Sequence, residues 1–180
     1  MREGDEGFIA ALHAHAPAAD RADKLALYGW LVGDWETTVT AYSPNGSYEA
    51  LGEIHAGWIL EGRAIQDVWT IPRADSSSAS PFPVAGNWFG TTVRSYDPTI
   101  DAWRISWIDP ATNAYRQQIG RGRGADIVQL GTSENGAQSR WSFIEITPAS
   151  FRWLGESSSD EGATWMLIVE VRARRSNAHP

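Results

Sequence analysis

From residue 34 onward, apolar and polar residues alternate along the chain, and turn signals interrupt the alternation at nearly regular intervals. In the first such segment, DWETTVTAY at residues 34–42, Trp35 and Val39 fall on one face of an extended strand and Glu36 and Thr40 on the other. A period of two is typical of a β-strand whose faces meet different environments. This pattern restricts most of the chain to β structure.

The interruptions have the chemistry of tight turns. They occur at residues 43–47 (SPNGS), 97–101 (DPTID), 109–114 (DPATNA), 121–126 (RGRGAD), 134–137 (ENGA), 147–150 (TPAS) and 157–163 (SSSDEGA). Asn-Gly pairs favour the turn that joins adjacent antiparallel strands, and the intervening segments are rich in β-branched and aromatic residues. We expect about ten strands, over residues 34–43, 47–56, 63–71, 88–97, 101–109, 114–121, 125–132, 138–146, 149–157 and 164–174.

An antiparallel sheet of this size tends to curl, and closure removes its exposed edges. The sequence therefore predicts a mainly β fold, an up-and-down barrel over residues 34–175, with a two-sheet sandwich as the alternative. A chain of 180 residues has room for one such core.

The first 33 residues have a helical pattern instead. Asp20 is placed to cap a helix that carries Leu25 and Tyr28 and ends near Gly33. We expect one or two N-terminal helices in residues 1–33, packed on the barrel, and a tail at residues 176–180. Trp35 would then be the first inward side chain and would close one end of the barrel.

Charge and cysteine content limit the partners. The net charge of −7 argues against binding a phosphate backbone, and no apolar run is long enough to span a membrane as a helix. The absence of cysteine fits a reducing compartment. We expect a cytoplasmic protein that binds neither nucleic acid nor membrane, and a homodimer stays open.

Four stretches carry a resemblance to known barrels: LVGDWETTV at 31–39, GWILEGRAIQDVW at 57–69, VRSYDPTIDAWRISWID at 93–109 and SSSDEGATWMLIVEVRARR at 157–175. The first resembles the opening of small calycin-type barrels, and the others resemble the bacterial family called DUF1579. The resemblance implies a lipocalin-like or fatty-acid-binding-protein-like barrel whose opening tryptophan plugs one end. It implies no particular activity.

The chain also resembles, more distantly, the haem-binding barrel nitrobindin, but it departs from nitrobindin in two places. ETTVTAY, residues 36–42, replaces the glycine-rich repeat expected after the opening tryptophan, and no histidine occurs between His55 and His179 to serve as a late proximal ligand. A haem function is therefore disfavoured, and we expect no cofactor. The four histidines also lack metal-ligand spacing, so we expect no metal site.

Several polar residues share a strand face with large aromatic residues, and such faces would line a cavity with apolar walls and a few polar anchors if they point inward. Asp67 and Glu145 are the candidate catalytic residues, and either carboxylate would need a buried partner such as Arg94. The candidate ligand-binding residues are Trp69, Trp88, Arg94, Tyr96, Trp107, Tyr115, Gln117, Trp141 and Trp153.

Three functions are compatible with this pattern. The first is the binding of a small, largely apolar or aromatic molecule in the barrel. The second is an isomerase, cyclase or lyase that uses Asp67 or Glu145 as a general acid or base, with a pKa raised by desolvation. The third is a structural or interaction protein whose ten tryptophans only fill the interior. The long Ser- and Pro-rich segment at 72–87 is either a lid over the cavity or simply a mobile loop.

Overall fold

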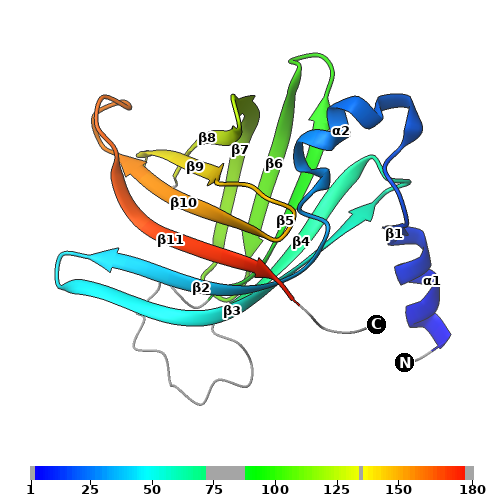
Figure 1. The fold of residues 1–180 in the computed structure, drawn as a ribbon, viewed down its shortest axis with the longest axis horizontal. Helices are drawn as coiled ribbons and strands as arrows, with labels where there is room; N and C mark the ends of the chain where they lie inside the picture. The colour runs from blue at the N-terminus through cyan, green and yellow to red at the C-terminus, as the bar shows by residue number, and fades with distance from the viewer. Residues whose placement is uncertain (1–2, 72–87, 134–135, 177–180) are drawn as a thin grey trace.

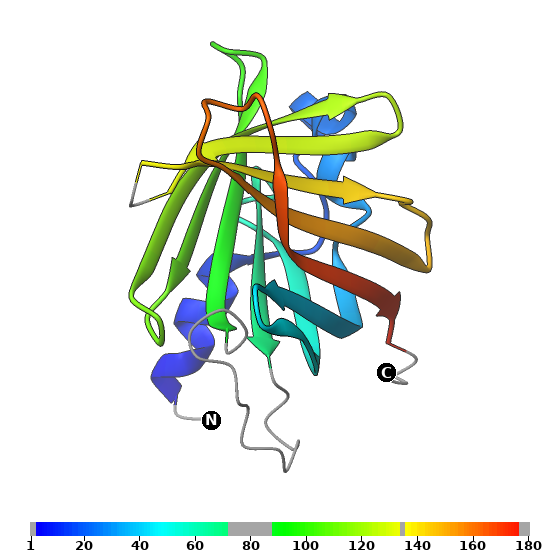
Figure 2. The ribbon, with the colours of Figure 1, turned by 90° about the vertical axis from the view of Figure 1, so that its left-hand side faces the viewer.

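A single antiparallel sheet closes into a barrel in the computed structural model, which describes residues 3–71, 88–133 and 136–176 (Figure 1). Ten strands pair in the order β3-β2-β11-β10-β9-β8-β7-β6-β5-β4, and β3 pairs with β4 to complete the circle. Figure 2 shows the same closure from the side. The strands are β2 Gly33–Ser43, β3 Gly46–Ile59, β4 Ala64–Ile71, β5 Trp88–Asp97, β6 Ala102–Asp109, β7 Ala114–Arg123, β8 Asp126–Thr132, β9 Gln138–Ile144, β10 Ser150–Ser158 and β11 Met166–Arg175.

This architecture confirms the predicted ten-stranded up-and-down barrel and shows that the sandwich alternative is wrong. Each predicted strand overlaps an observed one, because the turn residues punctuate the chain where the hairpins form. The strand ends differ by a few residues. The difference that matters is at β9, which ends at Ile144 rather than at residue 146.

The N-terminal segment contains α1 Glu3–Leu12, the two-residue strand β1 His13–Ala14, a 3₁₀ turn at Ala19–Arg21, and α2 Ala22–Gly29. The strand β1 pairs with the end of β3, and α2 lies across one end of the barrel (Figure 1). Within the described ranges, no helix has the length and apolar character needed to cross a bilayer.

The predicted cap of α2 is wrong. Asp20 lies inside the 3₁₀ turn, and α2 begins after Arg21 without a side-chain cap hydrogen bond. The Asp20 carboxylate instead accepts two hydrogen bonds from Nη1 of Arg63, at 2.9 and 3.1 Å. Because Arg63 lies just before β4, this ion pair ties the helical segment to the barrel rather than starting the helix.

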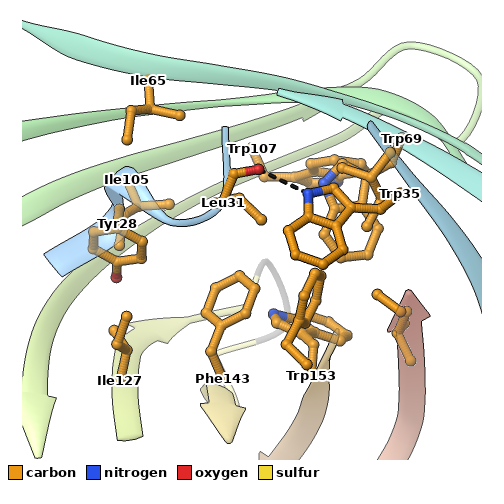
Figure 3. Packing of buried hydrophobic residues seen from close by; sticks show 14 of the residues in the cluster. Tyr28, Leu31, Trp35, Ile65, Trp69, Ile105, Trp107, Ile127, Phe143 and Trp153 are labelled. Atoms are coloured by element: carbon orange, nitrogen blue, oxygen red, sulfur yellow. Dashed lines mark hydrogen bonds between the residues drawn. The ribbon is translucent and has the colours of Figure 1, made fainter. Parts of the chain in front are cut away.

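Trp35 closes the barrel beneath the segment that follows α2. Its side chain is fully buried, and its Nε1 donates a hydrogen bond of 2.7 Å to the Leu31 carbonyl (Figure 3). The Phe151 ring lies 4.8 Å away and the Arg175 guanidinium lies 4.0 Å above the indole. Arg175 also donates to the Val32 carbonyl at 2.6 Å, so the end of the last strand holds the helical segment over the tryptophan.

The side chains of α2 fill the interior at the same end. Leu25 and Tyr28 are fully buried, and the Tyr28 hydroxyl donates a hydrogen bond of 3.0 Å to Oε1 of Gln129 on β8. The Tyr28 ring packs edge-on against Trp103 with centroids 4.8 Å apart. Burial raises the pKa of the Tyr28 phenol well above its ordinary value of 10.0.

Gly120 on β7 provides the space that α2 requires. A Cβ at this position would lie 2.4 Å from the Tyr28 hydroxyl and 2.7 Å from Cδ1 of Ile105, both buried. We therefore expect Gly120→Ala to lower the free energy of unfolding by about 1 to 3 kcal/mol, since overpacking a filled core forces its neighbours apart. Denaturant unfolding measures the change.

The matched control is Gly57→Ala on β3, where a Cβ would meet nothing within 4 Å. That substitution should change the unfolding free energy by less than about 0.5 kcal/mol or stabilise slightly. Equal losses for the two variants would show that α2 does not press on β7.

The buried phenol also predicts a pH dependence. Because its pKa is higher in the folded than in the unfolded chain, the contribution of Tyr28 is complete below pH 10 and is lost as pH rises towards the folded value. Stability should therefore decline in alkali, and Tyr28→Phe should flatten that decline while lowering stability at neutral pH through loss of the Gln129 hydrogen bond. Urea unfolding between about pH 8 and 11 measures both effects. Curves of equal slope would contradict this account.

Candidate functional site

The half of the barrel away from α2 encloses a cavity of about 620 Å³. Strand β2 runs from the helical end at Gly33 to the opposite end at Ser43, and Tyr42 near its end lines the cavity. Met166, at the start of β11, also lines it and is 67% exposed. The cavity therefore opens at the end of the barrel opposite Trp35.

Five tryptophans form most of its apolar wall. They project from β4, β5, β6, β9 and β10, and adjacent ring centroids lie 5.4 to 6.3 Å apart in tilted or edge-on contacts. The five are Trp69, Trp88, Trp107, Trp141 and Trp153. Figure 3 shows Trp69, Trp107 and Trp153 together in the barrel interior. Edge-to-face contact of this kind is the favoured arrangement of aromatic rings.

Glycines on neighbouring strands make room for these indoles. A Cβ at Gly90, which pairs with Trp69, would lie 2.6 Å from the Trp107 ring. Gly155 pairs with Trp141, and a Cβ there would lie 3.0 Å from the Trp153 ring. The indole rings therefore approach the backbone of the wall closely at these points.

A buried ion pair borders the cavity on the side of α2. Nη1 of Arg94 donates a short hydrogen bond to Oδ2 of Asp67, and Oδ1 of Asp67 accepts one of 3.1 Å from the Thr92 backbone. The Arg94 guanidinium also lies 5.6 Å from the Tyr28 ring centroid and 5.7 Å from that of Phe143. Arg94 reaches the cavity, whereas Asp67 is fully buried behind it and does not line it.

A second ion pair lies on the opposite wall. Glu156 on β10 lines the cavity and accepts two hydrogen bonds of 2.7 Å from Arg140 on β9. The hydrogen bond with Glu156 raises the pKa of the Arg140 guanidinium above its ordinary range. Arg140 also stacks 4.3 Å from the Trp165 ring. The negative charge of Glu156 is thus neutralised within the wall.

Arg116 on β7 is the third cation near the cavity. It faces inward, pairs directly across from Trp107 on β6, and lines the cavity. Within residues 3–71, 88–133 and 136–176, its guanidinium has no hydrogen-bond or ion-pair partner. The cavity therefore combines aromatic walls, two ion pairs and one arginine that has no counter-charge in the described part of the chain.

Six of the nine candidate ligand-binding residues line this cavity: Trp69, Trp88, Arg94, Trp107, Trp141 and Trp153. Tyr96 does not line it. This residue lies near the helical end of β5, where its hydroxyl donates a hydrogen bond of 2.6 Å to Asp101 and its ring packs against Trp103. Tyr96 lies on the same face of β5 as Trp88 and Arg94, as predicted. It is too far along the strand towards the helical end to reach the cavity.

The predicted inward face of β7 is wrong. Tyr115 is 53% exposed, and Gln117 points outward with it and donates a hydrogen bond of 2.7 Å to the Tyr115 hydroxyl. The preceding hairpin pairs Asp109 with Ala114, and this register places Arg116 rather than Tyr115 or Gln117 opposite the inward Trp107.

The two candidate acids do not reach the cavity. Glu145 follows the last residue of β9 with a φ of +51°, is 61% exposed, and pairs with Arg152 at 2.6 Å on the outer surface, so its predicted inward position is wrong. Asp67 faces inward as predicted, and its pairing with Arg94 is the partner that a buried carboxylate requires. Full burial behind that arginine separates it from the cavity.

Sequence reasoning missed several polar residues of the wall, namely Arg116, Ser139, Glu156 and Ser157. Arg116 pairs with Trp107 across β6 and β7, and because Trp107 faces inward, this pairing places Arg116 on the inner face as well. The segment 72–87, interpreted above as a lid or a mobile loop, lies outside the described residues. In the described part of the chain no histidine lines the cavity, and no group of three or more His, Asp or Glu side chains could hold a metal ion.

Comparison with known proteins identifies the fold and no family. No family model matches the chain, and no curated protein matches it. The chain is similar to the solved structure of the S-type phycobiliprotein lyase CPES from Guillardia theta, with a TM-score of 0.56 and 11% identity over 91% of this chain and 100% of that chain. This likeness agrees with a closed β-barrel fold; neither DUF1579 nor nitrobindin is supported by a family match.

Because Asp67 is buried and Glu145 is exposed, replacing each carboxylate with its amide should change the unfolding free energy by different amounts. Asp67→Asn leaves the buried Arg94 without its counter-charge and should lower the unfolding free energy by about 3 to 5 kcal/mol. Glu145→Gln breaks an exposed ion pair and should cost less than about 1 kcal/mol. Denaturant unfolding compares them, and equal costs would contradict the placement of either residue.

Proposed function

We propose that the protein binds a small, flat, largely apolar or aromatic molecule in the barrel cavity. The observation that carries this proposal is a cavity of about 620 Å³ walled by five tryptophans. Small-molecule sites are typically of about 300 to 1,000 Å³, with apolar walls and a few polar anchors. The volume of this cavity falls within that range.

The arrangement of the tryptophans favours binding over a purely structural role. Trp35 and Trp103 pack against Phe151 and Tyr28 at the helical end of the barrel. The five cavity tryptophans instead contact one another around an open space. Indole rings offer large apolar faces and lose few rotamers on binding, so a flat ligand gains contact at low entropic cost.

One of these indoles has a polar group without a partner. Nε1 of Trp69 is buried and makes no hydrogen bond to any described residue. A buried donor of this kind is costly when it is unsatisfied. This atom is shielded from the cavity as well as from bulk solvent, so it does not count among the polar anchors of the wall.

The positions of the two candidate acids support the binding proposal over the enzyme alternative stated above. The enzyme alternative depended on Asp67 or Glu145, and neither carboxylate reaches the cavity. Pigment-like molecules with conjugated rings belong to the proposed ligand class. Because the chain shares its fold with a phycobiliprotein lyase, such molecules should be among the first compounds tested.

The test uses N-phenyl-1-naphthylamine, a neutral three-ring fluorophore that brightens in an apolar environment. The wild-type protein should bind one molecule per chain and transfer energy to it from tryptophan. Ala114→Phe places a ring in the cavity from β7 and should weaken binding by at least about tenfold, which is 1.4 kcal/mol of lost contact.

Gln117→Phe is the control, because it adds the same ring to the exposed face of the same strand. This variant should bind the fluorophore like the wild type. The proposal fails if the wild-type protein shows no saturable binding, or if Gln117→Phe and Ala114→Phe weaken it equally.

A further inference from the structure

We propose that the ligand carries an anionic group and that Arg116 binds it. This inference rests on the proposed function, since it concerns the ligand of the same cavity. It narrows the ligand class from flat apolar molecules to flat apolar anions, such as aromatic carboxylates or sulfonates.

The charges around the cavity lead to this conclusion. Arg94 is neutralised by Asp67, and Glu156 is neutralised by Arg140 through two hydrogen bonds. Once both pairs are accounted for, one positive charge remains among the described residues that line the cavity, that of Arg116. A chain with a net charge of −7 thus directs into this cavity a cation that has no counter-charge among the described residues.

The surroundings of Arg116 make that charge effective. Its side chain is half-buried and lies across from Trp107, one of the five wall tryptophans. Charges attract more strongly where low-polarity walls replace water, and a charge-assisted hydrogen bond is about twice as strong as a neutral one. The planar guanidinium offers a fork of N–H donors that suits two oxygens of a carboxylate or sulfonate.

A second donor lies on the same wall. Gln118, two residues along β7, donates from Nε2 to Oγ of Ser139 at 3.2 Å. Ser139 lines the cavity, and because its oxygen accepts that bond, its hydroxyl proton is available to another acceptor. Arg116 and Ser139 thus place a guanidinium and a hydroxyl on one side of the cavity, with the tryptophans completing the wall.

A matched pair of fluorophores tests the inference. The anion 1-anilinonaphthalene-8-sulfonate and neutral N-phenyl-1-naphthylamine share one ring system and differ in the sulfonate group. Both are titrated into the wild type, Arg116→Met, Arg116→Lys and Arg123→Met. Arg123 lies at the exposed end of the same strand, so its replacement removes the same charge outside the cavity. Thermal unfolding verifies that each variant is folded.

Arg116→Met should weaken binding of the sulfonate by about ten- to a hundredfold and leave binding of the neutral fluorophore within about twofold. Arg116→Lys should recover part of the sulfonate affinity, and Arg123→Met should retain all of it. Equal effects of Arg116→Met on the two fluorophores, or no effect on either, would overturn the inference while the proposed function stands. Failure of the wild type to bind the neutral fluorophore would instead overturn the proposed function.

Discussion

The pairing of β3 with β4 is the constraint on which the rest of the structure depends. Seven residue pairs, from Glu53 with Thr70 to Ile59 with Ala64, join these strands and close the sheet. Closure decides which alternate residues face inward on every strand, because a one-residue slip would exchange the two faces. A barrel of ten strands has more interior space than its own side chains readily fill. The two ends of this barrel differ in how far side chains fill that interior space.

At one end the space is filled. α2 inserts Leu25 and Tyr28, Trp35 packs beneath the following segment, and Arg175 fastens that segment from the last strand. At the other end the tryptophans line the wall around a cavity. The Arg94–Asp67 pair borders the two regions, since Arg94 contacts both the Tyr28 ring and the cavity. Stability and proposed binding therefore use separate parts of one interior, and substitutions at Gly120 and Ala114 should affect them separately.

Sequence periodicity was sufficient for the fold but only partly sufficient for the site. Strict alternation and specific turn residues identified all ten strands, and they grouped Asp67 with Trp69 on β4 and Arg94 with Trp88 on β5, as the structure has them. On β7 both faces carry polar residues, so alternation alone did not distinguish Gln117 from Arg116. The hairpin that pairs Asp109 with Ala114 resolves the choice, because Trp107 faces inward and its partner must do the same. The prediction for Glu145 failed for another reason: β9 ends at Ile144, two residues earlier than expected, and Glu145 follows it with a positive φ and an exposed side chain.

Native mass spectrometry tests the central claim most directly. Freshly purified protein would be incubated with an extract of small metabolites, freed of unbound compounds and measured under conditions that preserve noncovalent complexes. The account predicts one small molecule per chain of 19.8 kDa, released on collisional activation and absent from the Ala114→Phe variant. The bare chain mass for the wild type in every preparation, or an adduct that persists undiminished in Ala114→Phe, would contradict it.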